Sequence, residues 1–418
     1  MKKIIISADW VGLPTPKKLG TLRVDRVRGK EAFSFEYDSD WLAMDHSVHL
    51  DPDLSLFAGP QYLADSKPNF GFFLDSSPDR WGRMLMDRRE VIIARNEGRP
   101  ATSLMESDYL LGVHDESRMG GLRFQLSDQG AYLADDQAMK APPFTSIREL
   151  EQASLKVEDD NFFEDKDALK WIRILIAPGS SLGGARPKAN VRDSEGNLWI
   201  AKFPSKSDEF DSGAWEFLVS QMASEIGIRT PATNCERFSL QQHTFLSRRF
   251  DRLHGERRIH FASAMTLLGY QDGYGHREGG SYLDLIELIE IYGAKPIEDI
   301  RELWKRVVFF VLVSNTDDHL RNHGFLLTPD GWRLAPAYDI NPNPFGNGLS
   351  LNISAIDNNQ SRDLCMEVAA QFRWQDQEAH AFFNHASKVI SGWKARAKAV
   401  NISPAEQVMM ERAFRLAR

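Results

Sequence analysis

The sequence predicts an α+β fold with a β-rich first part and a mostly helical last part. Near the N-terminus, LGTLRV and EAFSFEY alternate apolar and polar residues, which is typical of half-buried strands. Beyond Leu283 the apolar residues recur at helical spacing, and a predicted β-hairpin at Gly324 to Leu334 interrupts this pattern. A chain of 418 residues can bury several packed layers, so we expect two or three subdomains.

Changes in composition predict three regions along the chain. A β-rich N-terminal domain covers 1–125. The stretch from Gln125 to about Pro143 combines Asp, Gln and Gly with paired prolines, which indicates a linker or a surface crossover. The second region, 144–255, mixes strand and helix patterns, and the third, 256–418, is mostly helical.

The elements within these regions follow from local patterns. The N-terminal MKKIIISADW is too short for the core of a signal peptide and is predicted to be the first strand. The segment from Asp75 to Gly98 changes to helical spacing. From Ile172 to about Ser205 the pattern predicts strands, with RILIAPG as one strand and DSEGN as a hairpin turn. Helices are predicted from Asp211 to Ile226 and from Asp376 onward.

Composition excludes several classes of protein. Apolar residues make up 42% and charged residues 26%, and the net charge of -8 gives no general affinity for nucleic acid. Cys235 and Cys365 are the only cysteines, which is too few for a disulfide framework or a zinc cluster and fits a reducing, cytoplasmic location. The longest strongly apolar run, Val307 to Val313, is too short to span a membrane.

One segment carries the pattern of phosphoryl-transfer chemistry. In VLVSNTDDHLRNH, Asp317 and Asn322 are five residues apart, as the catalytic base and a metal ligand are in protein kinases. Asp318 is four residues from Asn322, so the spacing selects Asp317 as the base. The run LWKRVVFFVLV is predicted to be a buried helix that fixes this loop. A predicted hairpin, GFLLTPDGWRLAP, would then bring Asp339 beside Asn322 as oxygen ligands for Mg²⁺.

A purely structural role is the alternative for each of these residues. Asp317 and Asp318 would also serve to cap the end of a helix, and Asp339 would fit a turn. The ordered set, rather than any single residue, favours phosphoryl transfer.

A glycine-rich segment lies upstream, at Gly179 to Lys188. Its backbone N–H groups could approach phosphate oxygens, but it matches neither a Walker A loop nor GxGxxG, and a plain hairpin turn fits as well. The following strand places Lys202 among apolar neighbours, where a lysine is costly unless it is paired. Glu216 on the next helix is its candidate partner. The alternative is a lysine that snorkels from an edge strand.

At these residues the sequence resembles the HipA family of toxin kinases. The matching segments are SLGGARPKA, WIAKF, LSRRFDR, SNTDDHLRNHGFLL and LAPAYDI, and FEYDSDWL, SPDRWG and GGLRF resemble the small N-terminal domain of that family. The resemblance covers nearly the whole chain from about Gly20. It implies a two-lobed fold like that of protein kinases, an extra β-rich N-terminal domain, and ATP and Mg²⁺ as cofactors.

The resemblance also implies roles for individual residues. Asp317 matches the catalytic base, and Asn322 and Asp339 match the Mg²⁺ ligands. The positions that match the nucleotide site are Gly183, Gly184, Ala185, Arg186, Lys188, Lys202, Arg248, Phe250, His319, Asn322, Tyr338 and Asp339. Ser181, or the adjacent Ser180, matches an autophosphorylated serine whose modification switches the kinase off. Arg248 departs from the glutamate that the family often has, which puts nucleotide preference in doubt.

The implied biology is phosphorylation of a serine on an aminoacyl-tRNA synthetase, which would arrest growth. A small helix-turn-helix antitoxin that binds operator DNA would restrain the kinase. Two other readings stay open. One is a small-molecule phosphotransferase, such as an antibiotic or sugar kinase. The other is a non-catalytic, ATP-binding co-repressor subunit, which would use the basic residues Arg248, Arg249, Arg252, Arg257 and Arg258.

Overall fold

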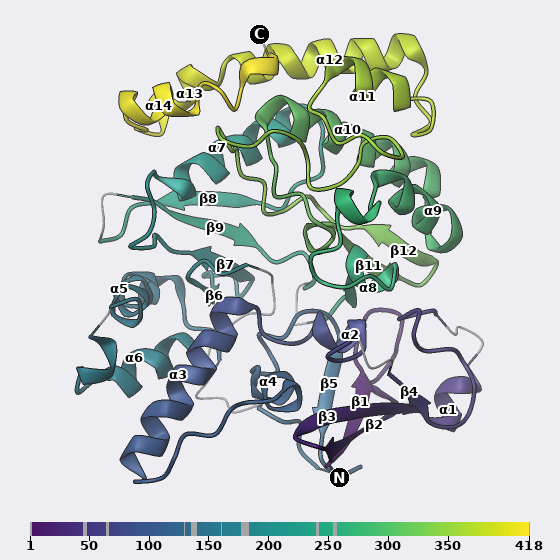
Figure 1. The fold of residues 1–418 in the computed structure, drawn as a ribbon, viewed down its shortest axis with the longest axis vertical. Helices are drawn as coiled ribbons and strands as arrows, with labels where there is room; N and C mark the ends of the chain where they lie inside the picture. The colour runs from purple at the N-terminus through teal and green to yellow at the C-terminus, as the bar shows by residue number, and fades with distance from the viewer. Residues whose placement is uncertain are drawn as a thin grey trace. The chain divides into compact units, whose positions relative to one another are not determined.

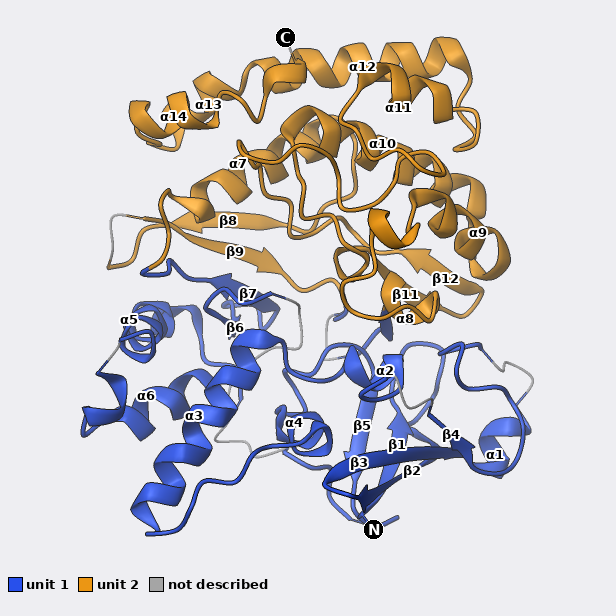
Figure 2. Ribbon diagram, in the orientation of Figure 1, with its two compact units in different colours: residues 1–206, 251–262 blue, residues 207–250, 263–418 orange. Residues whose placement is uncertain are grey.

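The computed structural model describes residues 2–44, 48–63, 67–128, 130–134, 140–159, 161–176, 184–239, 242–253 and 257–417 (Figure 1). The chain divides into two compact units (Figure 2). Unit 1 comprises Met1–Lys206 and Asp251–Ala262, and unit 2 comprises Ser207–Phe250 and Ser263–Arg418. The three predicted regions are defined by changes in composition, whereas the two units are defined by compactness. The boundaries of the three regions therefore stay a prediction.

The N-terminal part of unit 1 is an antiparallel sheet with the strand order β4-β3-β2-β1-β5. Its strands are β1 (Lys2–Ala8), β2 (Lys17–Val27), β3 (Lys30–Tyr37), β4 (Gln61–Tyr62) and β5 (Leu122–Gln125). Ile4, Leu22, Phe35 and Phe124 are buried in its core. The predicted strands at the N-terminus and in LGTLRV and EAFSFEY are therefore confirmed, and each contains consecutive buried residues, so side chains on both faces of the sheet are covered there.

Helices make up much of the rest of unit 1. They are α1 (Ser39–Leu42), α2 (Gly71–Leu74), α3 (Arg80–Asn96), α4 (Glu106–Gly112), α5 (Ile147–Val157) and α6 (Ala168–Ile176). The helix predicted between Asp75 and Gly98 corresponds to α3. It begins where the Asp79 carboxylate accepts a hydrogen bond from the Gly82 N–H at 2.7 Å, which satisfies one of the open donors of the first turn.

The strand predicted for RILIAPG is wrong, because its described residues lie in helix α6. Ala168, Ile172 and Leu175 are buried, and their spacing of four and three residues is that of one helix face. The isoleucine-rich run suggested a strand because the helical period becomes visible only with the residues upstream of it.

The hairpin predicted around DSEGN is confirmed within unit 1. Strands β6 (Lys188–Arg192) and β7 (Leu198–Lys202) pair antiparallel, with Lys188 opposite Lys202. Asp193 closes the turn, because its Oδ1 accepts hydrogen bonds from the N–H groups of Glu195 at 2.9 Å and Asn197 at 2.8 Å.

Unit 2 is mostly helical, with two short hairpins. Its helices are α7 (Ser212–Glu225), α8 (Ala264–Leu267), α9 (Tyr282–Tyr292), α10 (Pro296–Val313), α11 (Arg362–Val368), α12 (Asp376–Ser391), α13 (Trp393–Ala399) and α14 (Pro404–Met410). The hairpins are formed by β8 (Thr233–Glu236) with β9 (Thr244–Arg248), and by β11 (Gly324–Thr328) with β12 (Gly331–Leu334). Strand β10 (Phe261–Ser263) lies where the chain passes between the units.

Helix α10 is the centre of the unit 2 core. Every residue from Val307 to Val313 is buried, as predicted for the helix before the candidate catalytic loop. The apolar residues on all sides of this run reflect burial in protein, and none of the helices within the described ranges is long and apolar enough to cross a membrane. The β-rich start and helical end confirm the predicted α+β fold class.

Candidate functional site

The candidate catalytic loop leaves helix α10 through a sharp change of backbone direction. Ser314 caps the helix in the left-handed conformation, with φ of 51°, and its hydroxyl donates to the Ala413 carbonyl at 2.9 Å. The Asn315 N–H returns to the Phe310 carbonyl at 2.9 Å. A non-glycine residue with positive φ needs a firm support, and here the buried helix end and the Ala413 carbonyl provide it.

Asp317 and Asp318 point into opposite environments. The Asp317 side chain is 70% exposed and lies 3.7 Å from His319 Nε2 through its Oδ1. Asp318 is buried, and its carboxylate accepts hydrogen bonds from the Tyr282 hydroxyl and from the Ser350 N–H, the latter at 2.6 Å. Burial raises the pKa of Asp318 to about 6, against the lowering effect of these hydrogen bonds. The exposed carboxylate is thus the one that could receive a proton from a substrate.

Asn322 is held with its amide oxygen available for other contacts. The side-chain Nδ2 donates to the Asp317 carbonyl at 2.7 Å, across the five-residue spacing that marked the motif. This hydrogen bond occupies the nitrogen, so Oδ1 remains as the acceptor atom of the amide. His323 fixes the other side of the loop, because its Nε2 lies 3.2 Å from the Asp318 carbonyl.

The β11–β12 hairpin returns the chain to this loop. The Tyr338 hydroxyl donates to the Arg321 carbonyl at 2.7 Å, so the residues that precede Asp339 and Asn322 are in direct contact. Asp339 has a φ of 57°, which is a strained conformation for a residue with a side chain. Its Oδ1 lies 3.3 Å from Asn341 Nδ2, which donates to it. The predicted return of the chain by the hairpin is confirmed, while the metal-binding role of Asp339 stays a prediction.

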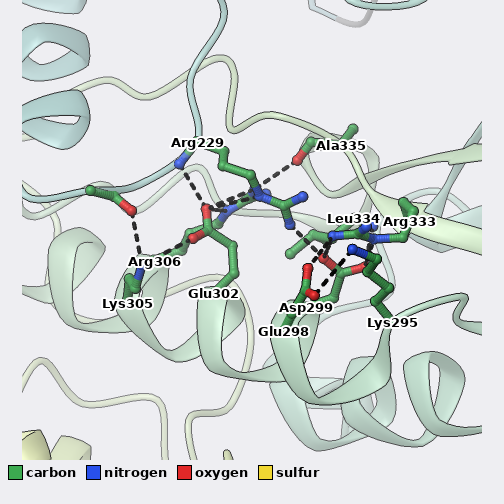
Figure 3. Close-up of polar contacts among 11 residues, drawn as sticks. Arg229, Lys295, Glu298, Asp299, Glu302, Lys305, Arg306, Arg333, Leu334 and Ala335 are labelled. Carbon is green, nitrogen blue, oxygen red and sulfur yellow. Dashed lines mark hydrogen bonds and ion pairs between the residues drawn. The ribbon is translucent and has the colours of Figure 1, made fainter.

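A buried charge network on helix α10 fixes the end of that hairpin (Figure 3). Asp299 accepts a hydrogen bond from the Leu334 N–H at 3.0 Å. One turn further along the helix, Glu302 pairs with Arg306 at 3.3 Å. The Arg306 guanidinium also donates to the Ala335 carbonyl at 2.6 Å. Both Leu334 and Ala335 are therefore held directly by side chains of α10.

The same network holds the connection between α7 and β8. The Arg229 N–H donates to Glu302 Oε1 at 2.9 Å, and its guanidinium donates to Asp299 at 2.5 Å (Figure 3). The Arg229 carbonyl in turn accepts the Ala337 N–H at 2.7 Å. The chain is thus fixed at Leu334, Ala335 and Ala337, just before it reaches Asp339. Sequence reasoning missed this network, because its charged residues are spread over three distant segments.

Two aromatic residues assigned to nucleotide binding come together within unit 2. The rings of Phe250 and Tyr338 have centroids 5.4 Å apart at an angle of 36°. Both side chains are partly exposed. Because Tyr338 is adjacent to Asp339, this aromatic pair lies next to the candidate metal ligand.

The candidate phosphate loop belongs to unit 1 and is described in part. Ser180, Ser181 and Gly183 lie outside the described residues. Gly184 and Ala185 are exposed and Arg186 is partly exposed. These residues were assigned to ATP by resemblance, and that role stays a prediction.

Lys188 is buried at the start of β6. Its side chain is 2% exposed, and Nζ lies 2.9 Å from Asp79 Oδ2 at the beginning of α3. A buried ammonium needs such a partner. The sequence motif did not indicate Asp79, although it lies in the SPDRWG segment that resembles the family.

The remaining assigned residues divide between the units. Lys202 is partly exposed at the end of β7 in unit 1, whereas Glu216 is buried on α7 in unit 2. Their predicted ion pair stays a prediction. Arg248 is partly exposed at the end of β9.

The basic segment considered for nucleic-acid contact is largely engaged in the protein. Arg258 pairs with Asp115 at 2.6 Å, and Arg252 pairs with Asp251 at 2.6 Å. Arg249 is buried, and Arg257 is exposed. Engagement of Arg252 and Arg258 within the protein leaves Arg257 exposed and Arg248 partly exposed, and this small amount of accessible positive charge gives the co-repressor reading little support.

The residues present fit a magnesium ion that is shared with a nucleotide. Within the described ranges, no group of three or more His, Cys, Asp or Glu residues is gathered for a metal. Mg²⁺ in nucleotide sites needs fewer protein ligands, because one or two side-chain oxygens are completed by phosphates and water. Asn322 Oδ1 and the Asp339 carboxylate would be such a pair.

Comparisons with known proteins find relatives described as putative kinases and a solved structure of similar fold. "Putative kinase Y4mE" of Sinorhizobium fredii is 24% identical over 332 residues, which are 73% of this chain and 71% of that protein. A "Putative kinase" of Haemophilus influenzae is 26% identical over 181 residues, which are 39% of this chain and 52% of the relative. The fold resembles a chain of the HipA, HipB and operator DNA complex of Shewanella oneidensis MR-1, with a TM-score of 0.66, 16% identity, and coverage of 96% of this chain and 94% of that chain.

The family of HipA-like C-terminal domains matches residues 180–400, which is more than half of the 418 residues. The match includes the loop that carries Asp317 and Asn322, the β11–β12 hairpin and Asp339. The chain therefore belongs to the HipA-like C-terminal domain family.

Proposed function

We propose that this protein is an ATP-dependent serine/threonine kinase that phosphorylates a protein. The observation that carries the proposal is the loop from Ser314 to His323. In this loop Asp317 is exposed, and the Asn322 side chain uses its nitrogen in a hydrogen bond, so that its oxygen remains as an acceptor. The hydrogen bond from Tyr338 to Arg321 joins the loop to the segment that carries Asp339. These are the parts that phosphoryl transfer requires.

Each part has a distinct role in the proposed reaction. Asp317 accepts the proton of the acceptor hydroxyl, and Asn322 and Asp339 hold Mg²⁺. When bound there, the ion would supply positive charge against the negative charge that develops on the transferred phosphate. Phe250 and Tyr338 hold the adenine.

Unit 1 carries the groups proposed to meet the phosphates. Gly183, Gly184, Ala185, Arg186 and Lys188 form the loop for them, and Lys202 adds a positive charge. Pairing with Glu216 would orient that lysine.

Regulation is part of the proposal. A phosphate on Ser181, or on Ser180, would add about −1.5 to −2 charge beside the nucleotide phosphates and would compete for Arg186 and Lys188. The loop would then leave the phosphates and activity would fall. Mass spectrometry after incubation with ATP should find phosphate here, and Ser181→Ala should stay active for longer. Phosphate found only at other residues would refute this switch and leave the kinase reading in place.

The proposed biological setting is a toxin–antitoxin pair in the cytoplasm. The Shewanella protein of similar fold is in complex with HipB and operator DNA, which supports a helix-turn-helix antitoxin as partner. DNA would be met only through that antitoxin, and an aminoacyl-tRNA synthetase is the proposed substrate.

The decisive experiment is incubation of the purified protein with labelled ATP, Mg²⁺ and cell lysate, followed by mapping of the phosphorylated residues. The proposal expects phosphoserine or phosphothreonine on a small number of proteins. Label that enters only small molecules would instead establish a small-molecule phosphotransferase. ATP binding without any transfer would favour the non-catalytic reading.

A further inference from the structure

The segment that follows Asp339 is tied closely to the candidate catalytic loop. We refer to residues 340–361 as the return segment. The Asn343 N–H donates to the Ser314 carbonyl at 3.0 Å, and Asn343 Nδ2 donates to Thr316 Oγ1 at 2.7 Å. Further along, the Ser350 hydroxyl donates to the Thr316 carbonyl at 2.7 Å. Thr316, the residue before Asp317, is thus bound by the return segment at both its side chain and its backbone.

Phe345 is an exposed aromatic residue on this anchored stretch. Phe345 is 64% exposed, although its N–H donates to Asn343 Oδ1 at 2.9 Å. The next residue, Gly346, packs so closely on Thr316 that an added Cβ would lie 2.4 Å from the threonine Cγ2. The backbone on both sides of Phe345 is therefore fixed against the neighbour of Asp317.

These contacts limit the distance between Phe345 and Asp317. Asp317 follows Thr316, and Phe345 precedes Gly346, which packs on Thr316. Neighbouring Cα atoms are about 3.8 Å apart. The two Cα atoms are therefore within roughly 14 Å of each other, and a phenylalanine side chain extends several ångströms from its Cα. A hydroxyl that reaches Asp317 carries neighbouring residues of its own chain, which lie up to about 7 Å away along an extended backbone.

We propose that Phe345 is a specificity-determining residue that contacts an apolar side chain within two positions of the phosphorylated hydroxyl. The inference rests on the proposed protein kinase function and names a feature of its substrate. A small polar substrate would have nothing to bury against this ring, whereas a leucine, isoleucine or methionine beside the acceptor would remove apolar area from water. An exposed aromatic on a fixed backbone loses little conformational entropy when such a partner covers it.

The test compares matched peptides within each variant of the full-length protein. The probes are the phosphorylated sequence found in the lysate experiment, and the same peptide with its apolar residues flanking the acceptor changed to serine. We expect the wild-type protein to prefer the apolar peptide by about tenfold or more in kcat/KM, mainly through KM. Phe345→Ala should reduce this ratio to near one, and Phe345→Leu should restore most of it.

The control is Ile356→Ala, on the same return segment. Ile356 is 91% exposed, in the turn where the Ile353 N–H donates to the Asp357 carbonyl at 2.7 Å, and its removal should leave the ratio unchanged. The ratio cancels a general loss of activity, so it reports specificity rather than folding. An unchanged ratio in Phe345→Ala, or a mapped site without an apolar flanking residue, overturns the inference alone. Absence of protein phosphorylation by the wild type overturns the proposed function, and this inference with it.

Discussion

At the scale of single residues, two adjacent carboxylates differ because their surroundings differ. Asp317 faces solvent, whereas Asp318 is buried against Tyr282 and Ser350. An exposed carboxylate can meet a substrate and exchange a proton with it. A buried carboxylate with two donors instead fixes the loop. The exposure of Asp317 thus supports the prediction, made from its five-residue spacing to Asn322, that Asp317 is the base. Mutation tests this prediction.

Replacing Asp317 should stop the chemistry and leave the fold intact. We expect Asp317→Asn to lower the rate of phosphorylation by about 10²–10⁴-fold, because asparagine cannot accept the proton. Because the side chain is exposed, the melting temperature should hardly change. Asp330→Asn, at the exposed tip of the β11–β12 hairpin, is the control and should keep full activity. A near-normal rate for Asp317→Asn would rule out its role as the base.

Replacing Asp318 should change how stability depends on pH. The pKa of Asp318 is about 6 in the folded protein and near 3.8 when unfolded, so the folded state keeps its proton longer as pH rises. Below about pH 4 the group therefore does not lower the free energy of unfolding. As pH rises the free energy of unfolding falls, and the full loss is reached above about pH 6. Asp318→Asn has no such cost, and its Nδ2 could donate to the Tyr282 oxygen.

Urea unfolding at several pH values measures this effect. Between about pH 4 and pH 7, the free energy of unfolding of Asp318→Asn should improve relative to wild type by about 2–3 kcal/mol. Two parallel stability curves would show that the carboxylate is not perturbed by burial.

At the scale of secondary structure elements, helix α10 holds the backbone that leads to the candidate site through charged side chains on one of its faces. Asp299, Glu302 and Arg306 lie on one face of the helix, at spacings of three and four residues, and they hold Arg229, Leu334 and Ala335 (Figure 3). These contacts act on the backbone. They fix the path of the backbone from Leu334 towards Asp339, which has a strained conformation.

The buried and exposed glutamates of α10 should respond very differently to mutation. Glu302→Ala would leave the buried Arg306 guanidinium without its carboxylate, and we expect a loss of about 3–5 kcal/mol in the free energy of unfolding. Glu298 lies one turn earlier and has a side chain 59% exposed, against 5% for Glu302. Glu298→Ala should cost less than about 1 kcal/mol, although it also removes ion pairs with Lys295 and Arg333. Equal losses in denaturant unfolding would contradict the network's role.

At the scale of the whole molecule, the residues assigned to ATP divide between the two units. Lys202 belongs to unit 1, whereas Asp339 belongs to unit 2. If both groups serve the same nucleotide, substitutions in either unit must weaken its binding. This requirement follows from the assigned roles and can be tested without a structure of a complex.

Thermal unfolding with saturating ATP and Mg²⁺ provides the test. A ligand at about 100 times its Kd adds about 2.7 kcal/mol to the stability of the wild type. Lys202→Ala and Asp339→Ala should each lose most of this gain, and only Asp339→Ala should also lose the difference between ATP with and without Mg²⁺. Lys206→Ala, an exposed lysine paired with Asp159, is the control and should keep the full gain. A full gain in Lys202→Ala would remove this lysine from the site.

The sequence by itself determined the elements whose residues interact locally. Strands β1, β2 and β3, helix α10, the β11–β12 hairpin and the spacing of Asp317 and Asn322 all follow from periodicity and turn chemistry over short ranges. The failure at α6 has the same origin, since its apolar face continues beyond the short run that suggested a strand. The resemblance to known kinases supplied residue roles that periodicity could not.

Only the tertiary structure decided which polar groups are buried and what they contact. It separated Asp317 from Asp318, paired Lys188 with Asp79, joined Tyr338 to Arg321, and committed Arg252 and Arg258 to carboxylates. Lys188 and Asp79, like Arg258 and Asp115, are far apart in the chain, and charged residues look alike in a sequence whether they are solvated or buried. Burial is a property of the assembled core, because the cost of removing a charge from water depends on what surrounds it after folding.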